Sequence, residues 1–191
     1  MVFHPDLHRR RSMRLRDYDY VGAGAYFVTV CAWRRECLFG DGVDGGVLLN
    51  DVGVVVRDEW LRTAVIRPNI KLDEFVVMPN HFHAIFWITD PVGATRWVAH
   101  DRDAWSQTRA TQRVAPTAGP RSGSVGAIIG QFKSAATKRI NTLRHDIDNP
   151  VWQRNYHEHV IRGDRDLQAV RQYIVDNPAK WELDVNHPDR V

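Results

Sequence analysis

The sequence predicts an α+β domain in which helices pack on an antiparallel sheet. Residues 26–32 are rich in β-branched and aromatic side chains, which is typical of a strand. Residues 75–78 and 81–88 have the same character, and the turn-forming pair Pro79 and Asn80 separates them. We therefore expect these two segments to pair as a hairpin within the sheet.

Three further stretches carry apolar residues at helical spacing. The first begins at residue 50 or 51, where an Asx side chain can cap a helix, and it ends before Pro68. The second covers residues 125–144. The third covers residues 165–177 and is followed by Pro178, which favours the end of a helix at the preceding residue.

The length of 191 residues suits one domain with a well-buried core, which we expect to span residues 21–184. A basic N-terminal arm (1–20) precedes it, a tail (185–191) follows it, and residues 91–122 have the aperiodic composition of a loop excursion. No apolar run has the length of a membrane span. The two cysteines have no metal-ligand spacing, so we expect reduced thiols and a cytoplasmic protein.

The basic residues are unusual in kind, since 22 of the 26 are arginine and only 4 are lysine, at a net charge of +3. Arginine presents a planar fork that matches phosphate groups. Several arginines gather near the N-terminus with only Asp6 against them. This arm indicates contact with a polyanion, although a solvated tail and a GC-rich genome are alternative explanations.

His81 and His83 are the candidate ligands of a metal site. They lie one residue apart in a predicted strand, so their side chains point to the same face of the sheet. Neutral imidazole is the commonest transition-metal ligand in proteins. The alternative is a strand whose polar face is in contact with solvent.

Tyr173 and Asn177 are four residues apart on the last predicted helix and therefore lie on one face, one turn from each other. A tyrosine beside an apolar stripe is compatible with packing as well as with catalysis. The spacing alone leaves both interpretations open.

Taken together, these motifs resemble the HUH endonuclease superfamily and, within it, the REP-associated tyrosine transposases. The resemblance covers roughly residues 9–184, with the motifs in the same order. Its motifs are Arg14-Leu15-Arg16, Tyr18-Asp19-Tyr20, Gly24 to Thr29, Val77 to His83, Phe132-Lys133, Trp152-Gln153-Arg154, His159 to Arg162 and Tyr173 to Pro178.

The resemblance implies a ferredoxin-like antiparallel sheet with His81 and His83 on a central strand. It implies that these histidines hold a divalent cation, Mg²⁺ or Mn²⁺, and that Asn177 completes the protein ligands where relatives often carry glutamine. It also implies that Tyr173 is the catalytic nucleophile. The chain departs from the family pattern at His157, where relatives often carry an aromatic residue, and in the length of the excursion.

The implied activity is cleavage and rejoining of single-stranded DNA with hairpin or palindromic repeats, through a 5′-phosphotyrosine intermediate and a free 3′-OH. A monomer and a homodimer with exchanged active-site parts are both compatible with the sequence. The alternatives are a non-catalytic protein that regulates such repeats and a metal-dependent hydrolase of small phosphoesters, which would not need the tyrosine. The candidate DNA contacts are Arg9, Arg10, Arg11, Arg14, Arg16, Lys133, Lys138, Arg154 and Arg162.

Overall fold

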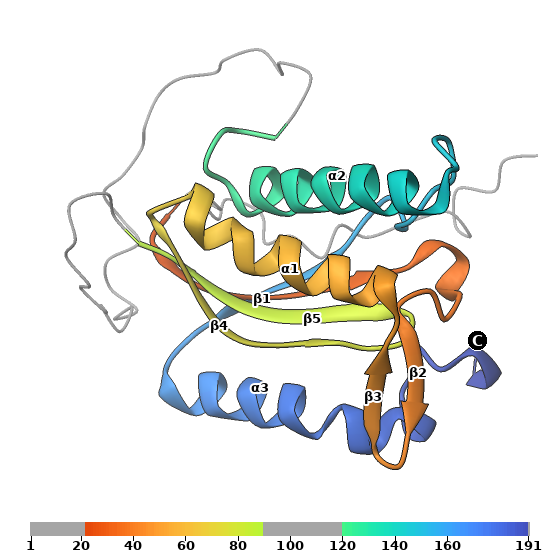
Figure 1. Cartoon of the computed structure of the whole chain (residues 1–191). Coiled ribbons are helices and arrows are strands. Elements are labelled where there is room, and N and C mark those ends of the chain that lie inside the picture. The colour runs from red at the N-terminus through yellow and green to blue at the C-terminus, as the bar shows by residue number, and fades with distance from the viewer. Residues whose placement is uncertain (1–21, 90–119, 191) are drawn as a thin grey trace, which may run out of the picture.

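The computed structural model describes residues 22–89 and 120–190 (Figure 1). Its main sheet has the strand order β4-β5-β1-β6, and every neighbouring pair is antiparallel. The strands are β1 (Gly24–Cys31), β4 (Ile70–Val77), β5 (His81–Ile88) and β6 (His157–Ile161). Strand β5, which carries both histidines, has a partner on each side, so the prediction of a central strand is confirmed.

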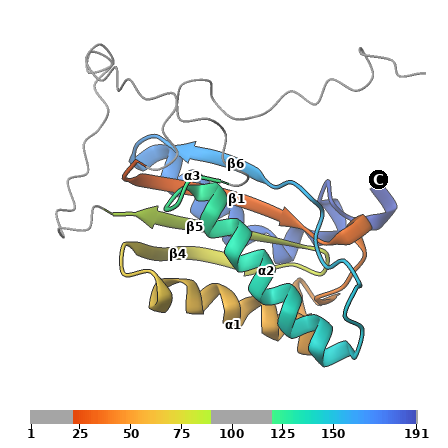
Figure 2. The ribbon, with the colours of Figure 1, turned by 90° about the horizontal axis from the view of Figure 1, so that it is seen from above.

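Within the described residues, three α-helices cover the sheet. Helices α1 (Asp51–Ile66) and α2 (Val125–Arg144) lie on one face, and α3 (Asp164–Asp176) lies on the other (Figure 1). From above, α2 crosses the sheet diagonally while α1 runs along β4 (Figure 2). The order β1-α1-β4-β5-α2-β6 is the βαββαβ arrangement of a ferredoxin-like fold. The predicted fold class is therefore confirmed, with α3 as an added helix on the open face.

The helix bounds follow the capping signals in the sequence. The Asn50 side chain accepts hydrogen bonds from the backbone N–H groups of Val52 and Gly53, each at 3.0 Å, and so begins α1. Ser124 caps α2 in the same way through the N–H of Ala127. Helix α2 has the predicted bounds, and α3 begins and ends one residue before its prediction.

Strand β4 begins at Ile70, whereas the sequence predicted a strand only from residue 75. The register between β4 and β5 shifts between Leu72 and Phe75, which marks a bulge. Residues 70–73 alternate between apolar and polar side chains, but the bulge shifts this alternation before Phe75, so no single period-2 pattern runs through the strand.

A short hairpin, β2 (Gly40–Val43) and β3 (Gly46–Leu49), was not predicted. Glycine and aspartate are depleted in strands, and they dominate this segment. The remaining elements are the 3₁₀ turns η1 (Trp33–Arg35), η3 (Pro178–Leu183) and η4 (Pro188–Arg190). None of the helices in residues 22–89 and 120–190 has the length and apolar character needed to cross a bilayer.

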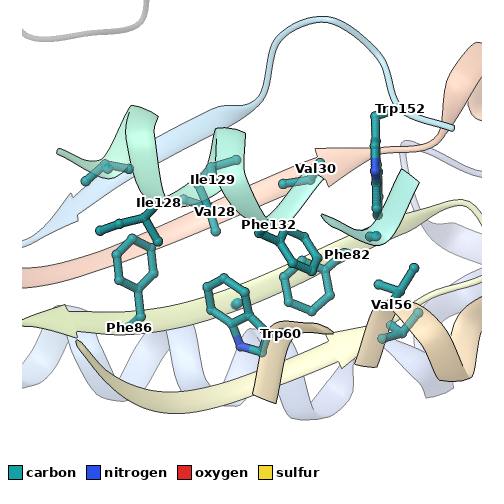
Figure 3. Packing of buried hydrophobic residues seen from close by; sticks show 14 of the residues in the cluster. Val28, Val30, Val56, Trp60, Phe82, Phe86, Ile128, Ile129, Phe132 and Trp152 are labelled. Carbon is teal, nitrogen blue, oxygen red and sulfur yellow. The ribbon is translucent and has the colours of Figure 1, made fainter. Parts of the chain in front are cut away.

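The main core lies between the sheet and helices α1 and α2, and aromatic rings fill its centre (Figure 3). The Trp60 indole packs edge-on against Phe82, Phe86 and Phe132, with ring centroids 5.1–5.7 Å apart. Phe82 and Phe86 alternate with the histidines along β5. Burial of these phenylalanines therefore directs His81 and His83 to the opposite face, toward α3.

Candidate metal centre and its tyrosine

The two predicted ligands lie side by side on the α3 face of the sheet. His81 and His83 are 0% and 2% exposed, and their ring centroids are 4.5 Å apart. The register places His83 beside Thr29 of β1, which in turn lies beside His157 of β6. The sheet thus presents a row of polar side chains across β5, β1 and β6 on this face.

Each imidazole uses its Nδ1 atom for a hydrogen bond within the fold. Nδ1 of His81 lies 2.9 Å from Oδ1 of Asn80, and Nδ1 of His83 lies 2.8 Å from the Thr29 hydroxyl oxygen. Nε2 of His83 lies 3.3 Å from the Tyr173 hydroxyl oxygen. Nε2 of His81 is buried without a hydrogen-bond partner in the described part of the chain.

Asp184 adds a carboxylate that the sequence analysis did not identify. Its Oδ2 lies 3.9 Å from Nε2 of His81, and one ligand atom each from His81, His83 and Asp184 all lie within 4.8 Å of one another. The Asn177 side-chain amide donates to the same Oδ2 over 3.3 Å. Like Nε2 of His81, the buried Oδ1 of Asn177 has no hydrogen-bond partner among the described residues.

These residues fit a divalent cation. Ligand atoms about 2.0–2.2 Å from one ion lie within roughly 4 Å of each other, which is close to the spacing of this cluster. A buried nitrogen and a buried oxygen with no hydrogen-bond partner in residues 22–89 and 120–190 leave the cluster unsatisfied as it stands. An ion bound by His81, His83, Asp184 and the Asn177 oxygen would satisfy both atoms.

Burial determines the protonation of these groups. It lowers the pKa of His81 to about 4 and that of His83 well below its usual range, so both imidazoles are neutral at pH 7 and can offer a lone pair. Burial also raises the pKa of Tyr173, and the nearby Asp184 carboxylate acts in the same direction. The phenol is therefore protonated near neutral pH.

Helix α3 carries Tyr173 and is fixed to the sheet by a partly buried ion pair. The Arg171 guanidinium donates to both oxygens of Asp73 over 2.8 and 2.6 Å, and the Trp87 indole N–H donates to the same carboxylate over 2.9 Å. Asp73 lies in the bulge of β4. Beneath the helix, Leu167 and Ile174 join an apolar cluster on this face.

The segment that follows α3 packs against His81 and positions Asp184. The Trp181 ring lies 6.0 Å from the His81 ring, and the Asn186 backbone N–H donates to Oδ1 of Asp184 over 2.6 Å. The Arg35 guanidinium also donates to the carbonyl of Val185. Residues 185 and 186, predicted as part of a tail, thus contact the domain.

Four of the predicted DNA contacts lie in the described residues, and they do not all line one groove. Lys133 and Arg154 line one groove, but Nζ of Lys133 donates to the carbonyls of Gln153 and Arg154, and burial lowers the pKa of this lysine to about 8. Lys138 is exposed on α2, and the exposed Arg162 directly follows β6. The remaining candidates lie outside the described residues: Arg9, Arg10, Arg11, Arg14 and Arg16.

No protein-family model matches this sequence. An uncharacterized protein of Haemophilus influenzae is 37% identical over 187 residues, which cover 98% of this chain and 98% of that protein. The chain belongs to the family of this Haemophilus protein. The identity extends across nearly all of both chains, so the family shares the full domain described above.

A solved structure supplies the comparison of folds. A REP-associated tyrosine transposase bound to a REP hairpin matches this chain with a TM-score of 0.56 at 19% sequence identity, over 88% of this chain and 74% of that one. This family therefore has the fold of that transposase. The fold implied by the sequence motifs is confirmed.

Proposed function

We propose that the protein is a metal-dependent endonuclease and strand transferase that cleaves and rejoins single-stranded hairpin DNA through Tyr173. The observation that carries the proposal is the 3.3 Å approach of the Tyr173 hydroxyl to Nε2 of His83, beside the cluster that fits a cation. The fold of a transposase bound to a REP hairpin supports the choice of substrate.

We assign the cation site to Nε2 of His81, Nε2 of His83 and the side-chain oxygens of Asn177 and Asp184. A mixed nitrogen and oxygen set of this kind suits Mg²⁺ or Mn²⁺. A cation bound there supplies Lewis-acid polarisation of a phosphate oxygen. Asn177 and Asp184 already lie in contact, since the Asn177 amide donates to Oδ2 of Asp184.

Tyr173 performs the covalent step. Its phenolic oxygen forms a bond to phosphorus while the bond between phosphorus and the 3′ oxygen breaks. The phenol loses its proton, the departing oxygen gains one, and the products are a 5′-phosphotyrosine and a free 3′-OH. The new ester has about the energy of the old one, so another 3′-OH can reverse the step and join DNA strands.

The exposure of the tyrosine suits a large substrate. Tyr173 is 44% exposed although its hydroxyl faces the buried histidines. A single strand can therefore reach the phenol from solvent, and the nucleophile and the cation site belong to one chain. This arrangement supports cleavage by a monomer, and a homodimer remains a prediction from the sequence. The arginines and lysines assigned to DNA contact remain proposals as well.

The decisive experiment is covalent capture. The protein is incubated with a labelled single-stranded hairpin library and Mn²⁺, and the mixture is denatured and separated by electrophoresis. We expect a labelled adduct that is absent with EDTA, in Tyr173→Phe and in His81→Ala. Tyr156→Phe is the matched control, because its hydroxyl bonds to Glu158 rather than to a histidine.

Three outcomes contradict the proposal. An adduct that persists in Tyr173→Phe would assign the chemistry to another residue. Hairpin binding without an adduct in the folded, Mn²⁺-loaded protein would favour the non-catalytic alternative, and phosphoester hydrolysis that survives Tyr173→Phe would favour the hydrolase.

A further inference from the structure

Asn80 lies in the tight connection between β4 and β5, directly before the first histidine, and its side chain is completely buried. The amide nitrogen Nδ2 lies 2.9 Å from the carbonyl oxygen of Arg35 and 2.7 Å from that of Asn186. The amide oxygen Oδ1 lies 2.9 Å from Nδ1 of His81. One side chain thus joins three segments that are distant in sequence.

These contacts determine which way the amide points. A carbonyl oxygen only accepts hydrogen bonds, so the atom that faces the carbonyls of Arg35 and Asn186 must be the NH₂ group, which has two protons to donate. Oδ1 must then face His81. Because Oδ1 only accepts, Nδ1 of His81 must carry the proton.

The protonation of Nδ1 places the lone pair of His81 on Nε2. That atom is buried, lies 3.9 Å from the Asp184 carboxylate, and has no hydrogen-bond partner in residues 22–89 or 120–190. The tautomer needed for ligation through Nε2 is therefore fixed before a cation binds. At His83 the partner of Nδ1 is the Thr29 hydroxyl, which can donate or accept and so fixes neither tautomer.

Asn80 is also connected to Asp184, through the backbone of Asn186. The carbonyl of Asn186 accepts from Asn80, while the N–H of the same residue donates to Asp184. The peptide segment that presents the carboxylate is thereby tied to the residue that orients the imidazole.

We infer that Asn80 is a positioning residue for the cation site, which holds His81 in the Nδ1–H tautomer and fixes the segment that carries Asp184 against it. The inference rests on the proposed function only in taking His81 and Asp184 as ligands. Partners that hydrogen-bond the second nitrogen of a ligating histidine orient the ring and raise its basicity.

The first test needs no variant. Nitrogen-15 NMR of the histidine-labelled, metal-free protein reports which imidazole nitrogen carries the proton. We expect His81 as the Nδ1–H tautomer at pH 7. A proton on Nε2 of His81 would overturn the inference.

The second test compares two buried asparagines that each bridge two carbonyls. Asn141 donates to the carbonyls of Ile147 and Asn149 at the end of α2, so Asn141→Leu controls for the loss of such a bridge. Calorimetric titration with Mn²⁺ should show binding about 10- to 100-fold weaker in Asn80→Leu. Asn141→Leu should bind Mn²⁺ as the wild type does, although thermal stability falls in both variants.

Equal Mn²⁺ affinity in folded Asn80→Leu and wild type would overturn the inference. This failure is separate from failure of the proposed function, since it leaves the DNA adduct of the wild type intact. Conversely, a protein that never forms the adduct but shows the expected tautomer and the loss of Mn²⁺ affinity supports the positioning role alone.

Discussion

The Tyr173 hydroxyl oxygen lies 3.3 Å from Nε2 of His83, across a sequence separation of 90 residues. The two rings pack edge to face, with centroids 5.2 Å apart, and Phe27 of β1 packs edge-on against the tyrosine. The histidine is placed by the core on the far side of β5, whereas the tyrosine is placed by the contacts of α3. The geometry of the pair therefore depends on how firmly α3 is attached.

The attachment of α3 predicts the effect of Asp73→Asn. The substitution removes the charge that holds Arg171 and leaves the Trp87 indole N–H with a weaker acceptor. We expect a loss of about 1.5–3 kcal/mol in the free energy of unfolding, the usual contribution of hydrogen bonds to a charged group. We also expect slower adduct formation with little change in Mn²⁺ affinity, measured by denaturant unfolding, the capture assay and calorimetry.

Asp58→Asn is the matched control for this prediction. Asp58 pairs with Arg57 on the exposed side of α1, where an ion pair contributes little. A loss of Mn²⁺ affinity in Asp73→Asn as large as its loss of adduct would show that the ion pair supports the whole site rather than the helix that carries the nucleophile.

The same ion pair predicts a dependence of stability on pH. Burial alone would raise the pKa of Asp73, but the hydrogen bonds from Arg171 and Trp87 outweigh it and lower the pKa to about 2. Because the folded state holds this carboxylate ionised more strongly than the unfolded state does, its stabilisation is present above about pH 4 and is lost as the pH falls toward 2. Denaturant unfolding between these values should show a steeper loss of stability in the wild type than in Asp73→Asn. Parallel curves would contradict it.

The carboxylate of Asp184 predicts a third result. Asp184→Asn keeps the shape of the side chain but removes the charge nearest to Nε2 of His81. We expect Mn²⁺ binding to weaken by roughly tenfold or more, because the affinity for hard cations follows the charge of the ligand set. Asp189→Asn is the control, since its carboxylate is exposed and lies at the end of the same segment. Unchanged Mn²⁺ affinity in Asp184→Asn would remove Asp184 from the site.

The sequence predicted those parts of the fold and site that depend on local periodicity. The alternation along β5 places His81 and His83 on one face, and a spacing of four residues places Tyr173 and Asn177 on one side of α3. The side chains do face the same cluster in the structure. Helices α1 and α2 were found for the same reason, since capping residues and apolar periodicity agree there.

The parts of the fold and of the site that the sequence did not predict depend on tertiary contacts. Asp184 reaches the histidines from an irregular segment after η3, where no period relates it to β5 or α3. The role of Asn80 depends on carbonyls from Arg35 and Asn186, which come together only in the folded chain. The hairpin of β2 and β3 has a composition that favours a loop, and it forms where Trp181 packs against Gly42.

This last contact predicts that the hairpin controls the site. A Cβ atom added at Gly42 would lie 2.4 Å from Cδ1 of Trp181, far inside ordinary contact, whereas one added at Gly46 would lie 3.4 Å from the carbonyl of Val43. Trp181 in turn packs on His81. Gly42→Ala must therefore displace the indole and disturb the segment that leads to Asp184. We expect a lower melting temperature and weaker Mn²⁺ binding in Gly42→Ala, and near wild-type values in Gly46→Ala, measured by calorimetry. If both variants bind Mn²⁺ as the wild type does, the hairpin is a separate surface feature and Trp181 does not connect it to the cation site.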